Sequence, residues 1–215
     1  MKHCNSADTP VEFGLNLNKA GRGSKVDNTL YRQIVGNLMY LTATRPDIMY
    51  GVSLISKYME SPTKIHLLAA KRILRYLQGT KDFGLFYKKG EKSDLIGFVD
   101  SDYTGNQDDR KSTSGYVFVL GTRAISWSSR KQKIVTLSTT EAEFVVATTC
   151  ACLAICLRKI IEELQFKKKG ATTIFCDNNS AIKLSKNPVL HGRSNHIDVK
   201  YYFLRDLNNE GTVEA

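Results

Sequence analysis

The sequence predicts a mixed α/β fold, in which a sheet flanked by helices follows a small helical module. Short β-rich runs bounded by turn residues recur between positions 83 and 176, and apolar residues recur at helical spacing on either side of them. With 42% hydrophobic residues in a chain of 215, there is enough material for a proper core. We divide the chain into a flexible arm (1–28), a helical module (29–82) and an α/β domain (83–215).

The charge balance favours a polyanionic partner. The chain carries 31 Lys and Arg against 21 Asp and Glu, a formal net charge of +10, and such an excess is typical of proteins that bind nucleic acid. Its five cysteines lack the paired spacing of a zinc site, which favours a reducing compartment. The N-terminus has no apolar signal segment and no run of 18 apolar residues occurs, so we expect neither secretion nor a membrane span.

The first third of the chain reads as an arm followed by helices. Residues 1–28 are polar and rich in Gly, Asn and Lys, a composition typical of a loosely attached arm. Apolar residues at helical spacing then predict helices over 30–40, over 48–59 and from 64 to Gly79. The third helix carries basic residues opposite its apolar stripe. A solvated surface explains such a face more simply than a phosphate contact, and both explanations stay open.

The sheet is predicted from β-rich runs at 83–87, 95–99, 115–120, 124–129 and 172–176. The unbroken apolar run from Leu95 to Val99 is typical of a strand covered on both faces. Gly121-Thr122-Arg123 should join the third and fourth runs as an antiparallel hairpin. After the last run we expect a short helix at 181–185, a second at 197–207 and the start of another strand near Val213.

The longest helical pattern runs from Ser138 to about Leu164. Ser138-Thr139-Thr140-Glu141 matches a capping box, which gives Glu141 a structural role in the first turn. Glu143 instead shares a helical face with the small residues Ala147, Cys150 and Ala154. Because that face should pack on the sheet, Glu143 is drawn into a buried position, where a carboxylate needs a partner or a cation.

Three carboxylates from separate elements form the candidate site. Asp100 ends one predicted strand, Asp177 ends another, and Glu143 lies in the first turns of the helix between them. If the two strands are parallel neighbours, all three acids meet at one edge of the sheet. Oxygen-only clusters suit Mg²⁺ or Mn²⁺. The alternative is that the two aspartates only cap turns or helices.

From about Leu30 onward the chain resembles the C-terminal part of copia-type LTR retrotransposon polyproteins. The helical module, from YRQIVGNLMYLTATRPDIMYG to AAKRILRYLQGT, is similar to the thumb or connection region after the reverse-transcriptase palm. The motifs GFVDSDYTGNQDDRKSTSGYVFVLG, ISWSSRKQKIVTLSTTEAEFVVA and FCDNNSAIKLSKNPVLHGRSNHIDVKYYFLRD are similar to the ribonuclease H domain of that family.

The resemblance implies a ribonuclease H-like fold and an endonuclease that hydrolyses the RNA strand of RNA–DNA hybrids with two Mg²⁺ or Mn²⁺ ions. Asp100, Glu143 and Asp177 stand where the family places its metal-binding acids, while Asp102 is a loop neighbour. We expect phosphate contacts from basic residues, and take as candidates Arg110, Lys111, Lys167, Lys168 and Lys169, with Lys71, Arg72 and Arg75 as further ones.

Two departures limit this expectation. No YxDD motif precedes the helical module, so we expect no polymerase activity. The family's fourth metal-site aspartate lies in a helix after the last strand, and the sequence ends at Ala215 before such a helix, so we expect an impaired nuclease unless Asp198 substitutes.

The setting implied by the resemblance is a retroelement polyprotein in a cytoplasmic virus-like particle or in the nucleus, with no membrane. Two alternative functions remain. One is a non-catalytic nucleic-acid-binding remnant. The other is an interaction protein like the secreted oomycete effectors, because Arg72-Ile73-Leu74-Arg75 spells RxLR.

Overall fold

The computed structural model describes residues 4–19, 23–88, 94–166, 170–186 and 198–214. It divides the chain into two compact units. The first takes in residues up to Phe86 together with Asn106–Arg110, and the second takes in Tyr87–Gly105 and Lys111 onward. Each unit has its own hydrophobic core, and we describe them separately.

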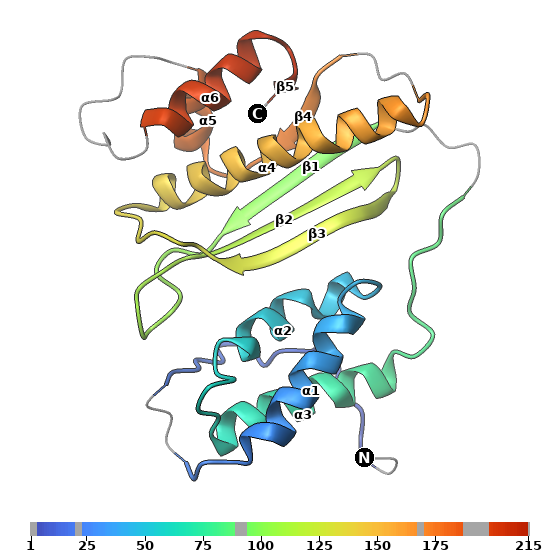
Figure 1. Ribbon diagram of the computed structural model, residues 1–215, viewed down its shortest axis with the longest axis vertical. Coiled ribbons are helices and arrows are strands. Elements are labelled where there is room, and N and C mark those ends of the chain that lie inside the picture. The colour runs from blue at the N-terminus through green and yellow to red at the C-terminus, as the bar shows by residue number, and fades with distance from the viewer. Residues whose placement is uncertain (1–3, 20–22, 89–93, 167–169, 187–197, 215) are drawn as a thin grey trace. The chain divides into compact units, whose positions relative to one another are not determined.

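The first unit is the predicted helical module. Its helices are α1 (Asn28–Leu41), the 3₁₀ turn η1 (Pro46–Ile48), α2 (Met49–Ser56) and α3 (Lys64–Gly79) (Figure 1). Their apolar faces enclose a core that includes Tyr31, Val35, Leu38, Ile48, Val52, Ile55, Ala70 and Ile73. The fully buried Tyr31 hydroxyl donates a 2.8 Å hydrogen bond to the Ile55 carbonyl, so the polar end of this ring is satisfied inside the core.

The N-terminal segment is packed on this module, so our expectation of a loose arm is wrong for its described residues. Ala7 and Leu17 are buried in the core. Arg75 donates to the carbonyl oxygens of Asn5 and Ser6 at 2.7 and 3.3 Å. Arg72 donates to the carbonyl and the hydroxyl of Thr9. Composition alone could not predict this, because the segment's partners lie more than sixty positions away along the chain.

His66 has a structural role in this unit. Its ring stacks on Tyr58 with centroids 4.1 Å apart, and Nδ1 accepts a 3.0 Å hydrogen bond from the backbone N–H of Thr63 at the start of α3. The bond fixes the tautomer, because Nδ1 must carry the lone pair and Nε2–H then donates to the Asn18 carbonyl at 3.1 Å. Burial lowers the pKa of His66, with the Asn18 bond and the charge of Asp108 acting in the opposite direction.

The second unit is built on a five-stranded mixed sheet in the described part of the chain, in the order β3-β2-β1-β4-β5. The strands are β1 (Leu95–Ser101), β2 (Thr113–Leu120), β3 (Arg123–Lys131), β4 (Thr172–Phe175) and β5 (Val213–Glu214). Neighbours among β1, β2 and β3 are antiparallel, whereas β4 runs parallel to both β1 and β5. The predicted ribonuclease H-like mixed sheet and its hairpin are confirmed. Gly121, at the hairpin turn, has the positive φ of 64° that favours glycine.

The predicted strand at 83–87 is wrong. Residues 83–88 form no strand, and the side chains of Phe83, Phe86 and Tyr87 are exposed. The β-rich composition of this run suggested a strand, but a strand also needs a hydrogen-bonded neighbour along its backbone. The Tyr87 hydroxyl donates to the Ala124 carbonyl, a single side-chain contact to the edge strand β3.

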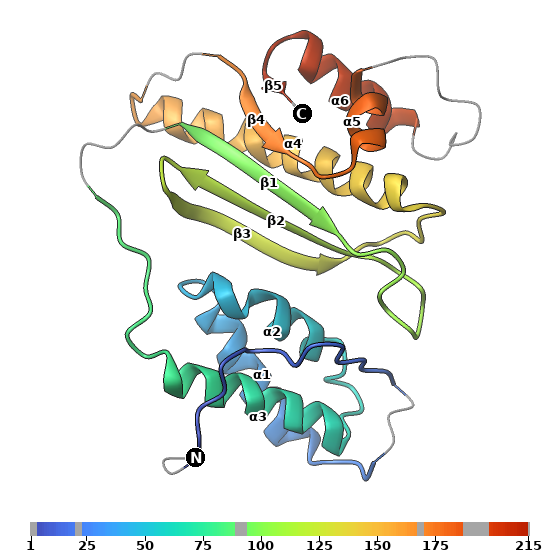
Figure 2. The same cartoon turned by 180° about the vertical axis from the view of Figure 1, so that it is seen from behind.

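Three helices lie on one face of the sheet (Figure 1): α4 (Thr139–Glu163), α5 (Asn179–Lys186) and α6 (Asp198–Asn209). Figure 2 shows the opposite face, which none of these helices covers. The core between α4 and the sheet includes Leu95, Val99, Phe118, Phe144, Val146, Cys150, Ala154 and Ile174. By length and composition α4 is apolar enough to cross a membrane, but half of its most apolar stretch is buried inside this unit, so its composition is that of a core helix.

Gly97 lets α4 approach the sheet closely. A β carbon at this position would lie 3.0 Å from the Phe118 ring and 3.2 Å from Sγ of Cys150. Both distances are shorter than ordinary van der Waals contact, so a side chain here would push the helix or the ring away. The height of α4 above β1 is therefore set by a residue with no side chain.

Candidate metal centre

Two aspartates lie at the same end of two neighbouring strands. β1 and β4 are parallel neighbours, and their register pairs Phe98 with Phe175. The rings of that pair stack with centroids 5.3 Å apart. Asp100 lies two positions beyond Phe98, and Asp177 lies two positions beyond Phe175. Asp100 is still part of β1, whereas Asp177 lies two residues past the end of β4, so the parallel register brings both aspartates to the same end of the two strands, and both are exposed.

Glu143 is brought to this edge by the start of α4. The helix begins after Ser138, whose hydroxyl accepts from the Glu141 backbone N–H at 3.1 Å, and Glu141 in turn accepts from the Leu137 N–H at 2.8 Å. Glu141 is thus occupied by the cap, as the sequence pattern predicted. Glu143 is only 4% exposed and lies on the buried face with Ala147 and Cys150.

The buried carboxylate of Glu143 is held at both oxygens. The backbone N–H of Ser101 donates to Oε1 at 2.8 Å, and the thiol of Cys176 donates a weaker 3.7 Å bond to Oε2. Burial is the largest influence on the pKa of Glu143 and raises it, and the negative charges of Asp100 and Asp177 raise it further. The bonds from Ser101 and Cys176 act in the opposite direction. The arrangement therefore disfavours the charge of Glu143 until a cation balances it.

In the described part of the chain, possible metal-ligand atoms of Glu143, Cys176 and Asp177 lie within 4.8 Å of one another. Asp100 is not in that group, although its charge acts on Glu143. Sequence reasoning missed Cys176, because the cysteines were considered only for the paired spacing of a zinc site. Its contact with Glu143 joins the end of β4 to α4, 33 positions apart in the chain. The only signal in the sequence is its position directly before Asp177.

The donors fit a hard divalent cation. Glu143, Asp177 and Asp100 supply carboxylate oxygens, the ligands that Mg²⁺ and Mn²⁺ prefer. Burial raises the pKa of the Cys176 thiol to about 11, so at neutral pH this group is a proton donor to Glu143. Asp102 serves the loop instead, because its carboxylate accepts from the Thr113 N–H. The side chain of Asp198 lies outside the described residues.

The basic residues proposed as phosphate contacts have different surroundings. Arg110 is exposed and has a positive φ of 56°. The Lys111 amine donates to the Lys133 carbonyl at 2.8 Å. Lys71 is exposed, whereas Arg72 and Arg75 hold the N-terminal segment and so serve the fold. Lys167, Lys168 and Lys169 lie outside the described residues.

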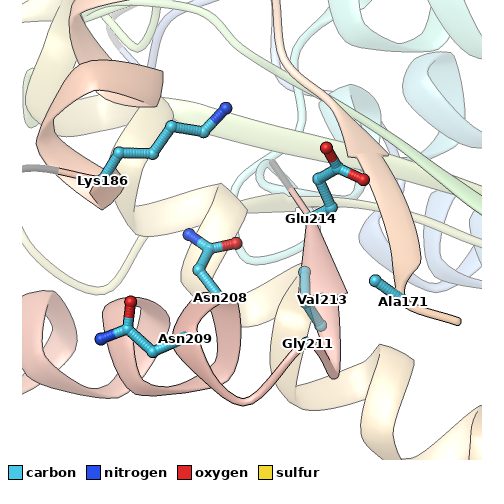
Figure 3. Close-up of a pocket in the computed structure, with 7 residues that line it drawn as sticks. All are labelled: Ala171, Lys186, Asn208, Asn209, Gly211, Val213 and Glu214. Carbon is cyan, nitrogen blue, oxygen red and sulfur yellow. The ribbon is translucent and has the colours of Figure 1, made fainter.

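A pocket of about 340 Å³ opens elsewhere in this unit (Figure 3), and it is lined by Ala171, Lys186, Asn208, Asn209, Gly211, Val213 and Glu214. Ala171 precedes β4, whereas Asp177 follows it, so the pocket and the acids belong to opposite ends of that strand. Four strand residues separate the ends by roughly 13 Å. The pocket is therefore not part of the acidic site.

Comparison with known proteins assigns the chain to a family. No family model matches it. The Retrovirus-related Pol polyprotein from transposon RE1 of Arabidopsis thaliana is 46% identical over 196 residues, which are 90% of this chain and 13% of that protein. The one from transposon TNT 1-94 of Nicotiana tabacum is 40% identical over 225 residues, covering 100% of this chain and 17% of the relative. The chain belongs to the copia-type retrotransposon Pol polyproteins. This Pol segment spans less than a fifth of the length of either relative.

A third relative concerns the RxLR letters. The Secreted RxLR effector protein 161 of Plasmopara viticola is 42% identical over 119 residues, 55% of the Pol segment and 84% of that protein. In the Pol segment these letters fall inside α3, where Arg72 and Arg75 bind backbone carbonyls of the N-terminal segment and Ile73 is buried. The structural roles of Arg72, Ile73 and Arg75 in the helical module therefore account for these residues.

Among solved structures, a foamy viral protease-reverse transcriptase in complex with dsDNA matches 94% of the Pol segment and 39% of its own chain, at 13% identity and a TM-score of 0.48. That similarity is too weak to bear on fold or function.

Proposed function

We propose that the sheet-containing unit of this Pol segment hydrolyses the RNA strand of RNA–DNA hybrids with the help of Mg²⁺ or Mn²⁺. One observation carries the proposal. The register of two parallel strands brings Asp100 and Asp177 to the same end of the sheet as the buried Glu143, whose pKa is raised and on which no positive charge acts among the residues that the structure describes. A carboxylate in such a position is costly unless it coordinates a cation, which favours a binding role over a purely structural one.

Each acid would have a distinct part in holding the metal. Glu143 offers Oε2, because Oε1 is occupied by the Ser101 N–H. Asp177 lies within the same group of ligand atoms, and Asp100 faces solvent at the end of β1. When bound, a pair of divalent ions supplies an activated water and stabilises the leaving oxygen of a phosphodiester. The exposure of both aspartates leaves the site open to a polymeric substrate.

Recognition of the hybrid would rest on charge and on the 2′-hydroxyls of its RNA strand. The net charge of +10 supports attraction to phosphates, and Arg110 is an exposed candidate for a direct contact. Lys111 is a weaker candidate, because moving its amine to a phosphate would break its bond to Lys133. Binding should therefore weaken steeply as the salt concentration rises.

The test is cleavage of a labelled RNA–DNA hybrid by the purified chain with Mn²⁺, compared with Asp100→Asn, Glu143→Gln and Asp177→Asn. We expect each substitution to lower the rate at least about a hundredfold, since losing a metal ligand removes the charge that organises the reaction. Glu141→Gln is the matched control, because it changes a glutamate two positions away that serves the helix cap. Equal rates for the wild type and Asp100→Asn would refute the proposal, and hybrid binding without metal-dependent cleavage would select a non-catalytic nucleic-acid-binding role.

A further inference from the structure

Gln132 is a buried polar residue beside the acidic site with no role in the preceding argument. It directly follows β3 and is only 6% exposed. Its backbone N–H donates to the Ser112 carbonyl at 2.8 Å, which continues the pairing of β2 and β3 by one residue. The side chain is thereby fixed at its base and directed into the unit, where it meets three other elements.

The side-chain amide of Gln132 links the sheet to α4. Nε2 lies 3.2 Å from Oγ of Ser101 in β1, 2.8 Å from Oγ of Ser114 in β2 and 3.0 Å from the carbonyl oxygen of Ala142 in α4. Ser101 and Ser114 are register partners in the β1–β2 ladder. A carbonyl can only accept a hydrogen bond, so the contact with Ala142 identifies the nitrogen end of the amide.

The other end of the same amide is unsatisfied. Oε1 of Gln132 is buried and has no hydrogen-bond partner among the residues that the structure describes. Leaving a buried acceptor unpaired costs roughly 1–3 kcal/mol. An apolar side chain of similar volume would avoid that cost, so stability alone gives a weak reason for glutamine here. The feature that needs an explanation is the nitrogen end, whose two hydrogens are shared among three acceptors.

Two of these contacts lead directly to Glu143. Ser101 receives the Gln132 amide at its hydroxyl and uses its own backbone N–H to bind Oε1 of Glu143. Ala142, whose carbonyl receives the same amide, is the residue before Glu143 in the first turns of α4. The amide thus holds both the donor that orients the carboxylate and the helical turn that carries it.

We propose that Gln132 is a positioning residue of the metal centre, which fixes the orientation of Glu143 through Ser101 and Ala142. Any effect of Gln132 on cleavage rests on the proposed nuclease function, whereas its effect on the orientation of Glu143 does not. Residues that hold metal ligands in place typically contribute ten- to a hundredfold to metal affinity. Gln132 acts on Glu143, which unlike the exposed Asp100 and Asp177 is buried and hydrogen-bonded at both carboxylate oxygens.

The test compares Gln132→Met with Thr136→Val in the full chain. Methionine keeps the volume of the glutamine side chain but cannot donate a hydrogen bond. Thr136 is the control because it is also buried, at 2% exposed, and its hydroxyl is hydrogen-bonded to Ser112. None of the hydrogen bonds described above joins Thr136 to Ser101 or Ala142. Thermal unfolding, Mn²⁺ binding by titration calorimetry and amide hydrogen exchange at Ser101 are measured for both. Ser101→Ala is included because it removes the hydroxyl that accepts from Gln132, and its result does not depend on how well Gln132→Met folds.

We expect Gln132→Met to weaken Mn²⁺ binding about tenfold and to speed amide exchange at Ser101 by a similar factor. Thr136→Val should lower the unfolding temperature comparably while leaving both quantities within about twofold of wild type. Ser101→Ala should reproduce part of the loss of affinity, because it removes the Ser101 link and leaves the Ala142 link, and adding it to Gln132→Met should change little beyond Gln132→Met alone. The proposal would be overturned if Gln132→Met left both Mn²⁺ binding and amide exchange at position 101 unchanged. If Gln132→Met does not fold, the same two measurements on Ser101→Ala decide. A wild-type chain that binds no Mn²⁺ would refute the proposed function, and Ser101 exchange would then decide the role of Gln132 by itself.

Discussion

The backbone N–H of Ser101 donates a 2.8 Å hydrogen bond to Oε1 of Glu143, which lies 42 positions further along the chain. The bond ties the end of β1 to the second turn of α4 and makes a buried carboxylate tolerable. It also leaves that carboxylate with one oxygen directed to the group that contains Asp177. The consequences for stability, metal binding and pH can each be measured.

Replacing Glu143 with glutamine should stabilise the metal-free protein at neutral pH. Burial and the neighbouring aspartates raise the pKa of Glu143 above its ordinary value of 4.5, so the folded state holds its proton more tightly than the unfolded state does. The contribution of Glu143 to stability is therefore full below pH 4.5 and is lost as the pH rises through the raised pKa. Glutamine does not titrate, so urea unfolding in a chelator should show Glu143→Gln gaining on the wild type between pH 5 and pH 7.5. A gain of the same size at pH 4 would contradict this explanation.

Mn²⁺ should raise the unfolding temperature of the wild type at neutral pH, since a ligand of the folded state stabilises it by mass action. At a hundred times its dissociation constant the ion contributes about 2.7 kcal/mol. Asp177→Asn, which removes a member of the ligand group, should lose most of this effect. Differential scanning calorimetry with and without Mn²⁺ measures it, and Asp102→Asn serves as control because Asp102 binds the Thr113 backbone. A comparable shift in Asp177→Asn would show that the ion binds elsewhere.

Arg75→Ala should loosen the N-terminal segment. The substitution removes two hydrogen bonds from a guanidinium to the carbonyls of Asn5 and Ser6, at a cost of about 1–2 kcal/mol. Amide hydrogen exchange over residues 4–18 should therefore accelerate at least about fivefold while exchange in the sheet stays the same. Lys71→Ala is the matched control on the same helix, where the side chain is exposed. Equal exchange in both variants would mean that the other contacts of the segment, such as the bonds from Arg72 and the burial of Ala7 and Leu17, hold it without the Arg75 side chain.

The helical unit should lose stability in mild acid through His66. Burial lowers the pKa of this residue below its ordinary value of 6.5, and Nδ1 must be unprotonated to accept from the Thr63 N–H. Its stabilising contribution is therefore present above pH 6.5 and is lost as the pH falls through the lowered pKa. Hydrogen exchange in the first turn of α3 should speed between pH 7 and pH 5, after correction for the intrinsic rate. His66→Gln keeps an acceptor for the cap without titrating, and its corrected rate should stay flat.

The parts of the fold that sequence could predict are those governed by local pattern. The burial of Glu143 followed from the small residues at helical spacing after it, and the role of Glu141 followed from the capping box. Local sequence patterns could not predict which distant segments contact each other. The described part of residues 1–28 looked like a loose arm because its partners, Arg72 and Arg75, belong to another element. Cys176 was missed because the cysteines were considered only for the paired spacing of a zinc site, and Cys176 meets Glu143 from another element.

Gly97 bears on how the buried carboxylate of Glu143 is placed. A methyl group at position 97 would crowd the Phe118 ring and Sγ of Cys150, and Cys150 lies two turns after Glu143 in α4. The three acids alone are therefore not enough to judge whether this site is intact in a related sequence. A residue without any functional group also shapes it.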